Sequence, residues 1–454
     1  MKCSRKLDWI DIGIFAVFTV FFGYLFITGE PQYLGDTFQH ENQFVTREPV
    51  YALFFQLLRS ISPQHHYQIM IVLQNLLAIA ANTIFVCFLR RYFSMHVFCI
   101  PVVVLIVLAP HIMTPLASAT NMILTNSLLS EGISFSLYLF FVIYILKAMT
   151  SEEILSKYTF LALGWAVLLS LVRGQMMTLL IVWFLVIGVK AVLNHKGKKL
   201  IWLTIMLAVS FVGRGMLVKT YNYLEQGIFV NTVSGQAMSV ANVIYVSDRE
   251  DGEAIQDEEL RALFYEIFDA AYADGMNYRF SGDGLIARAQ HHEECHDALN
   301  FDYFAVSAKE YISETKGIYV TDYQRMMVEV DKVASALMKE LLPQVIEKYV
   351  YNYIAMITMG FIRSVAYVHP ILNWYALLIY LCAAALMILL WKQNKKSKTA
   401  PFMAVVLLMI VGNVTATSLM LQCISRYMIY NLPLFYIAGL TMLIEYVQVS
   451  TRNK

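Results

Sequence analysis

Long apolar runs alternate with short polar links along most of the chain. The runs approach or reach the roughly 20 consecutive apolar residues with which a helix crosses a bilayer core. They lie near Trp9–Thr28, Tyr67–Leu89, Met95–Leu108, Gly132–Leu146, Tyr158–Val172, Gln175–Leu193, Leu200–Val218, Ile371–Trp391, Pro401–Leu421 and Tyr427–Val447. This pattern predicts an all-α polytopic membrane protein with about ten transmembrane helices.

Basic residues cluster in every second link between these runs. The clusters are Lys2, Arg5 and Lys6; Arg90 and Arg91; Lys147 and Lys157; Lys196, Lys198 and Lys199; Lys392, Lys395, Lys396 and Lys398; and Arg452 and Lys454. With ten spans every cluster falls on one side of the membrane, and the positive-inside rule makes that side cytoplasmic. We therefore expect a multi-pass protein of the cell (plasma) membrane with both termini in the cytoplasm.

One further apolar stretch, Tyr349–Val368, tests this topology. If it crossed the membrane there would be eleven spans, and the lysines that follow Trp391 would face outward. We therefore expect an interfacial or re-entrant helix whose tyrosines lie at the level of the lipid headgroups.

Two links on the outer side are long enough to form structure of their own. The first is 30–66. The second runs from about Lys219 to His369, and its stretch Asp257–Tyr272 carries apolar residues at helical spacing. These apolar residues are Leu260, Leu263, Phe264, Ile267 and Phe268.

The chain is accordingly expected to have three parts. An N-terminal transmembrane module with seven spans occupies 1–218. A mostly helical extracytoplasmic domain occupies 219–369, and three C-terminal spans occupy 370–454.

Composition agrees with a membrane location and excludes several other classes. Of 454 residues, 58% are hydrophobic and 15% charged, whereas soluble domains carry about 25% charged residues. The net charge is +1, and no dense basic block outside the links indicates nucleic acid as a partner. The six cysteines are scattered and indicate neither a disulfide framework nor a Cys-x-x-Cys metal site.

The first outer link contains an unusual concentration of charge next to the membrane. If "GDTFQHENQ" is helical, Asp36 and His40 lie one turn apart on one face, with Glu41 adjacent. The interpretation without a function is a solvated juxtamembrane loop. A carboxylate held at the boundary of lipid and water is also placed to act on a substrate whose tail lies in the bilayer.

The following "TREPVYALFFQLLRSI" predicts an amphipathic helix at the membrane surface. Thr46 is expected to cap it, and Pro49 suits its first turn. Its apolar face is predicted to contain Val50, Leu53, Phe54, Leu57 and Leu58.

Other polar motifs follow in a definite order. They are the "LTNSLLSEGISFSLYLFF" of Leu124–Phe141, the "LLSLVRGQMMTLL" of Leu168–Leu180 and the "SRYMIYNLPLFYIAGL" of Ser425–Leu440. With the early acidic residue and the "REPVYALFFQLL" helix, they resemble the GT-C superfamily of membrane glycosyltransferases, in particular bacterial protein mannosyltransferases and aminoarabinose transferases. The resemblance covers the first seven spans and, more loosely, the last.

The resemblance implies an inverting enzyme that transfers a sugar from a polyprenyl-phosphate-linked donor on the outer face of the membrane. The acceptor is a glycan, a lipid or a protein. In that family an Asp or Glu of the first outer loop is the general base on the acceptor hydroxyl. Asp36 matches that position best, and Glu41 is the reserve candidate.

A departing phosphate needs cations, and arginine's planar fork suits phosphate oxygens. We place Arg173, Arg426, Arg214, His40, Arg47 and Glu131 in the substrate- and phosphate-binding group, Glu131 orienting an arginine or the acceptor. The alternative for the arginines is snorkelling to lipid headgroups, and for Glu131 a structural helix-end acid.

A rival motif lies in "HHEECHD", which contains His292, Glu293 and His296 in the zinc-protease pattern. Glu294 within it and Asp297 after it put charge where such helices usually have uncharged or apolar residues, and no clear third ligand follows at a helix-borne spacing. We therefore expect a solvated helix and assign no metal ligands, with adventitious metal binding and zinc hydrolysis as the alternatives.

Three functional classes stay open at this level. The first is the glycosyltransferase. The second is a multispan polysaccharide polymerase or ligase that uses a lipid-linked oligosaccharide, in which Arg426 would matter more than Asp36. The third is a non-enzymatic lipid or solute transporter, although the chain shows no paired half-sequences. No cofactor is assigned, and dependence on a divalent cation is left open.

Overall fold

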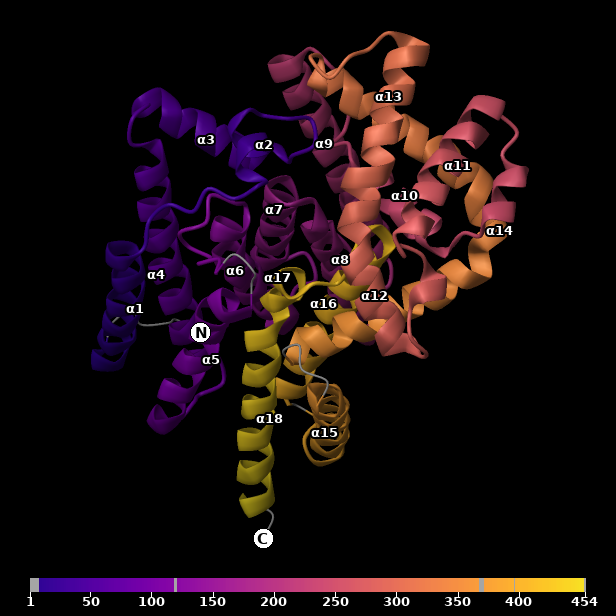
Figure 1. The fold of residues 1–454 in the computed structure, drawn as a ribbon. Helices are drawn as coiled ribbons and strands as arrows, with labels where there is room; N and C mark the ends of the chain where they lie inside the picture. Colours follow the sequence, from indigo (N-terminus) through magenta and orange to yellow (C-terminus); the bar gives the residue numbers. More distant parts are fainter. Residues whose placement is uncertain (1–7, 118–120, 367–370, 396, 453–454) are drawn as a thin grey trace.

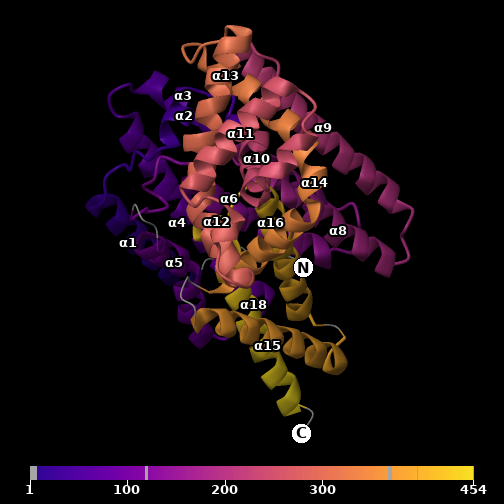
Figure 2. The ribbon, with the colours of Figure 1, turned by 45° about the vertical axis from the view of Figure 1, so that its right-hand side comes forward.

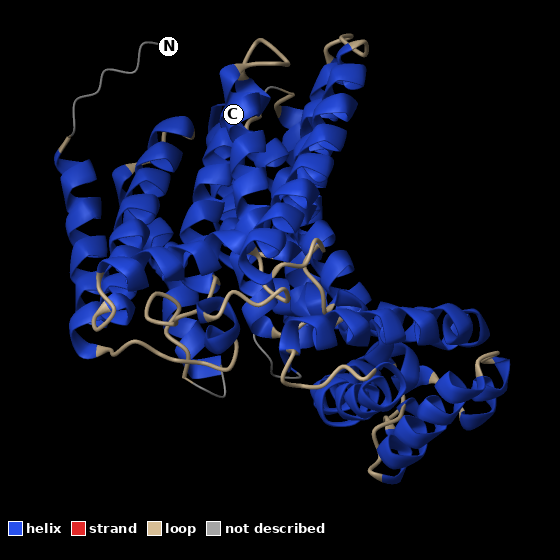
Figure 3. Cartoon of the chain, turned by 90° about the horizontal axis from the view of Figure 1, so that it is seen from above, coloured by secondary structure: helices blue, strands red, loops and turns tan. Residues whose placement is uncertain are grey.

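A computed structural model describes residues 8–117, 121–366, 371–395 and 397–452. Within these ranges the chain forms α-helices and short helical turns, and no strand (Figure 3). A single isolated bridge joins Gln32 to Ser127. The prediction of an all-α protein is confirmed for this part of the chain.

Nine described helices are long and apolar enough to cross a membrane. They include α1 (Trp9–Thr28), α4 (His66–Tyr92), α5 (Ile100–Ala117), α6 (Glu131–Thr150), α8 (Thr178–Leu193), α9 (Lys199–Gln226), α15 (Ile371–Gln393), α16 (Thr399–Met420) and α18 (Leu432–Arg452). Each coincides with an expected span. The remaining expected span is α7 (Lys157–Val172), an apolar helix of only 16 residues that packs against α6.

The burial of these helices differs in a way that fits a lipid surround. The apolar window of α6 is 78% buried, whereas that of α9 is 17% buried, and α9 stands at the edge of the molecule in Figure 2. Exposed Val209, Val212 and Leu217 on α9 have no reason to face water, because burial of apolar surface is the main favourable term in folding. A lipid environment accounts for them.

The basic links gather at one end of the helical bundle. Arg90, at the end of α4, bonds to Asp8 at the start of α1 (Nη2–Oδ2 2.6 Å). The hydroxyl of Tyr92 donates to the carbonyl of Leu146 near the end of α6, and the Lys190 ammonium of α8 donates to the carbonyl of Ala148. We call this the basic end.

Three exposed tryptophans lie near the same end. Trp9 begins α1, Trp202 lies in the first turn of α9, and Trp391 lies in the last turn of α15. Tryptophan prefers the boundary between lipid and water. Five basic residues of the predicted clusters lie outside the described residues: Lys2, Arg5, Lys6, Lys396 and Lys454.

The stretch 349–368 does not form a separate interfacial helix. Its described part is the last portion of α14 (Tyr323–Val365), one continuous helix of 43 residues that is not among the nine candidate spans. Tyr349 and Tyr353 donate their hydroxyls to the carbonyls of Leu419 and Thr415 on α16. These tyrosines therefore anchor α14 on the bundle, and their position at the headgroups stays a prediction.

A second hydrophobic core forms between the seventh and eighth expected spans. It runs from Ala237 to Val345, includes Cys295 of the helix Leu285–Ala298, and is built mainly from four helices grouped at the upper right of Figure 1. They are α10 (Gly235–Val246), α11 (Glu258–Ala273), α13 (Ala305–Lys316) and the first part of α14. The helix predicted over Asp257–Tyr272 is confirmed as α11, and Phe264 and Ile267 lie at its buried face.

The amphipathic helix of the first link is present as α3 (Pro49–Ile61), with Pro49 in its first turn as predicted. Thr46 does not cap it; Glu48 occupies the N-cap position, and the Thr46 hydroxyl donates to Gln39 Oε1. The buried face contains Tyr51, Ala52, Phe55 and Leu58, while Leu53, Leu57 and Ile61 are exposed. The helix thus has one apolar face in the protein and another available to lipid.

A buried ion pair at the basic end provides a test of the bundle. The Asp11 side chain is 2% exposed and pairs with both Arg90 and Arg91. Asp11→Asn leaves these guanidiniums without their buried counter-charge, and we expect it to destabilise the protein by about 3 kcal/mol. Thermal unfolding of the purified protein in detergent measures the effect.

The matched control is Asp8→Asn, which changes an exposed carboxylate on the same arginine. It should leave the unfolding temperature close to that of the wild type. Equal shifts for the two variants would contradict the assignment of Asp11 as the buried partner.

Candidate functional site

The link between α1 and α3 folds against the end of the bundle opposite the basic end. The Gln32 backbone N–H donates to the Asn126 carbonyl (2.9 Å), and the Thr37 hydroxyl donates to the Leu128 carbonyl (3.0 Å). Thr37 begins the short helix α2 (Thr37–Glu41), so these bonds fix the position of Asp36 immediately before it.

Asp36 lies between two arginines from distant parts of the chain. Arg47 Nη2 lies 2.6 Å from Asp36 Oδ1, and Arg426 Nη2 lies 3.9 Å from Asp36 Oδ2. Arg426 belongs to α17 (Ser425–Met428), immediately before the last span. About a third of the Asp36 side chain stays exposed, so one face of this carboxylate is open to a ligand.

A second acid–arginine pair lies deeper at the same end. Arg173 Nη1 is 2.5 Å from Glu131 Oε2, and both side chains are mostly buried. Arg173 also donates to Gln175 Oε1 and to the hydroxyl of Ser130. Because α6 begins at Glu131 and α7 ends one residue before Arg173, this pair joins two helix ends.

The two pairs meet at one aromatic ring. The guanidinium carbons of Arg173 and Arg426 lie 5.2 and 5.0 Å from the ring centroid of Tyr427. We call Arg47, Arg173 and Arg426 the arginine cluster. Its three guanidiniums gather around two carboxylates, Asp36 and Glu131, and guanidinium groups are well suited to bind an anionic ligand.

Two neighbouring amides hold this arrangement. Gln175 Nε2 donates to Asn413 Oδ1 (2.7 Å) and to the Tyr427 carbonyl (2.9 Å). Asn413 Nδ2 donates to the same carbonyl (2.8 Å). The residue that carries the shared ring is therefore fixed from both α16 and the turn before α8.

The expected shared face of Asp36, His40 and Glu41 does not form. The His40 ring is buried against the edge of Tyr51 and has no hydrogen-bond partner at Nδ1 among the described residues. Glu41 instead accepts from the hydroxyls of Tyr67 and Tyr33. The three side chains therefore lie in three separate environments: Asp36 contacts Arg47, His40 is buried against Tyr51, and Glu41 bonds to tyrosine hydroxyls.

Arg214 does not join the arginine cluster. Its Nη2 lies 2.6 Å from Glu48 Oε1, and both side chains are buried. A Cβ at Gly174 would stand 2.8 Å from the same Glu48 oxygen, so glycine permits this close approach. Burial raises the pKa of Glu48, and the charge of Arg214 opposes that rise.

Glu48 was not singled out from the sequence. The available signal was the intramembrane position of Arg214, because such an arginine needs an acidic partner. Nothing in the order of residues selected Glu48 over the other acids of the first link.

The His292-Glu293-x-x-His296 motif lies on α12 (Leu285–Ala298), and its side chains bond to groups of the protein. Both histidines are fully buried, so the expected solvated helix is wrong for this face. His292 Nε2 donates to Asn242 Oδ1 (2.8 Å), and His296 Nε2 donates to the Met238 carbonyl (3.2 Å). Glu293 pairs with Arg363 (2.5 Å).

Helix α12 also reaches the arginine cluster. Asp297 Oδ1 accepts from Gln422 Nε2 (2.9 Å), four residues before Arg426. Hydrogen bonds from His296 and Gln422, with the charge of Arg426, lower the pKa of Asp297, while burial opposes them. An acid of α12 therefore lies close enough to Arg426 to interact with its charge.

No protein family, curated protein or solved structure matches this chain. Among the described residues, no group of three or more His, Cys, Asp or Glu side chains is placed to hold a metal ion.

The buried His40 predicts a pH dependence of stability. Burial, together with the charge of Arg47, lowers the pKa of His40 from 6.5 to about 3. Below pH 6.5 the unfolded chain therefore binds a proton that the folded chain does not. The stabilisation that comes from keeping His40 neutral is fully present above pH 6.5. As the pH drops toward 3, its loss lowers the free energy of unfolding by up to about 1.4 kcal/mol for each pH unit.

His40→Gln should show a shallower loss of stability than the wild type between pH 6 and 4, measured by thermal unfolding across that range. His65 is exposed on the neighbouring link, and His65→Gln should retain the wild-type slope. Parallel curves for wild type and His40→Gln would rule out a neutral, buried His40.

Proposed function

We propose that this chain is an integral membrane glycosyltransferase of the inverting type. It transfers a sugar from a polyprenyl-phosphate-linked donor to a glycan, lipid or protein acceptor at the outer face of the membrane. The observation that supports this most directly is the pairing of a partly exposed carboxylate, Asp36, with the arginine cluster.

The chemistry assigns separate tasks to these groups. The acceptor hydroxyl gives its proton to an Asp36 oxygen as its own oxygen bonds to the anomeric carbon. The bond from that carbon to the phosphate oxygen breaks, and the lipid phosphate leaves with the electron pair. Arg426 and Arg173 stabilise the charge that develops on the phosphate.

Arg47 has a different role from the other two arginines. Its 2.6 Å contact orients Asp36 through Oδ1, while Oδ2, on the side of Arg426, is less closely held. Glu131 is a positioning residue, because it is buried and holds Arg173. Glu41 is too fully occupied by its tyrosine partners to be the preferred base.

Orientation follows from the distribution of charge. The basic end of the bundle is assigned to the cytoplasm by the positive-inside rule, which puts the arginine cluster and the second core on the outer side. The acceptor enters between the first link and α12, whose Asp297 lies beside the cluster. The donor's prenyl chain stays in the lipid.

A polymerase or ligase that uses lipid-linked oligosaccharide is the second candidate. One observation supports this second candidate: Arg426 contacts both Asp36 and the ring of Tyr427. Such an enzyme would depend on Arg426 for phosphate recognition and much less on Asp36.

Asp36→Asn tests the choice of base. The amide cannot take the acceptor's proton, and we expect the rate of sugar transfer to fall by about 10²- to 10⁴-fold. The donor is first identified by mass spectrometry of polyprenyl phosphates that copurify with the protein. Transfer is then followed in membranes as loss of sugar from that lipid.

Glu41→Gln is the matched control, because it changes a neighbouring acid to its amide outside the arginine cluster. It should keep most of the activity. Normal transfer by Asp36→Asn together with loss in Arg426→Gln would favour the polymerase or ligase, and normal transfer in all three variants would refute both enzyme proposals.

A further inference from the structure

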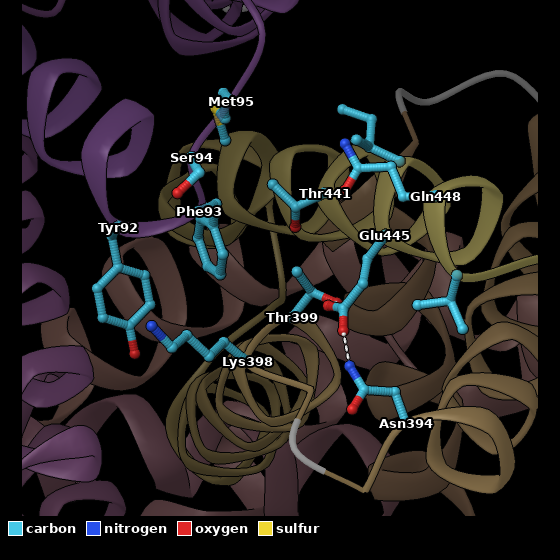
Figure 4. A pocket seen from close by; sticks show the side chains of 12 residues that line it. Tyr92, Phe93, Ser94, Met95, Asn394, Lys398, Thr399, Thr441, Glu445 and Gln448 are labelled. Carbon is cyan, nitrogen blue, oxygen red and sulfur yellow. Dashed lines mark hydrogen bonds between the residues drawn. The ribbon is translucent and has the colours of Figure 1, made fainter. Parts of the chain in front are cut away.

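A cavity of about 430 Å³ lies at the basic end of the bundle, far from the arginine cluster. It is open on one side and is lined by the end of α4, the turn after it, the link between α15 and α16, and the last turns of α18 (Figure 4). Along α18 its lining extends from Thr441 to Val449, a length of about 12 Å. The lining therefore follows the axis of α18 along its last three turns.

Two opposite charges line this cavity without pairing with each other. Lys398 extends toward the ring of Tyr92, with its ammonium 5.4 Å from the ring centroid (Figure 4). No carboxylate of the described residues lies within 4.0 Å of that ammonium, although Glu445 lines the same cavity. A cation and an anion held apart in one cavity are complementary to a ligand that carries both charges.

The Glu445 carboxylate is held by three hydrogen bonds and can accept another. Its Oε1 accepts from Asn394 Nδ2 (2.7 Å), and its Oε2 accepts from the hydroxyls of Ser397 (2.9 Å) and Thr399 (2.6 Å). A carboxylate offers about four acceptor positions. One position remains for a further donor, so Glu445 can hold the α15–α16 link and still bind an ammonium group.

The position of the cavity at the basic end of the bundle points to lipid as the source of the ligand. Exposed Trp9, Trp202 and Trp391 lie near this end of the bundle, where the lipid headgroups are expected. Phe93 and Ile444 add apolar side chains to the lining beside the charges. A glycerol backbone and its acyl chains fit against such side chains.

We propose that this cavity binds the zwitterionic head group of a phosphatidylethanolamine-type lipid. Its phosphate bonds to the Lys398 ammonium, and its own ammonium bonds to Glu445. This site does not depend on the proposed transfer reaction, because it lies at the other end of the bundle. It makes the membrane's own zwitterionic lipid a structural ligand that joins α4, α16 and α18.

Lipid retention tests the proposal. The full chain is reconstituted in nanodiscs that contain equal amounts of phosphatidylethanolamine, phosphatidylglycerol and phosphatidylcholine, and native mass spectrometry then identifies the lipid that stays bound. We expect the wild type to retain phosphatidylethanolamine. Lys398→Gln removes a charge-assisted bond and should lower that retention about tenfold.

Two further variants make the result specific. Glu445→Gln should also lower retention of phosphatidylethanolamine, because it removes the charge that recognises the ammonium. Lys395→Gln removes an exposed lysine of the same link that does not line the cavity, and it should behave as the wild type. Equal retention by all variants, or preferential retention of phosphatidylglycerol by the wild type, would overturn the proposal.

Soluble phosphoethanolamine separates a lipid ligand from a free one. If the lipid is the ligand, the soluble head group alone should leave the unfolding temperature unchanged in nanodiscs of phosphatidylcholine. A clear stabilisation by the soluble compound, with no retained phosphatidylethanolamine, would show that the ligand comes from the water phase and would exclude the lipid.

Discussion

Every strongly buried charge that we describe in the bundle has an opposite charge beside it, and this pairing organises the molecule. An isolated charge is very costly in a low-dielectric interior. Asp11 therefore joins α1 to the end of α4, Glu131 joins α6 to the turn after α7, and Glu48 joins the start of α3 to α9. The pairs connect helix ends that the apolar surfaces alone would leave free to shift.

The same constraint separates the two carboxylates of the candidate site. Glu131 is buried and committed to Arg173, so it acts on the position of that arginine. Asp36 keeps about a third of its side chain exposed and has one oxygen only loosely associated with Arg426. Two acids close together in space thus have different uses, because one is desolvated and paired while the other can meet a substrate.

The members of the cluster were predictable only in part, because Arg214, His40 and Glu41 lie elsewhere, and its connections were not predictable. Asp36, Arg173, Arg426 and Glu131 could be selected because charged residues next to or within a membrane are costly to keep. Nothing in their spacing showed that Arg47 and Arg426 contact one carboxylate, or that Tyr427 lies against two guanidiniums. Contacts between residues so far apart in sequence depend on how the helices pack.

The order of apolar and polar residues by itself determined the all-helical class, the approximate positions of the membrane helices and the gathering of basic links at one end. Its physical basis is local, because backbone groups in lipid must bond within their own helix. Only the tertiary structure decided the environment of each polar side chain. It buried His292 and His296 as donors to Asn242 and Met238 instead of leaving them in water, because the second core packs α12 against α10 and α14.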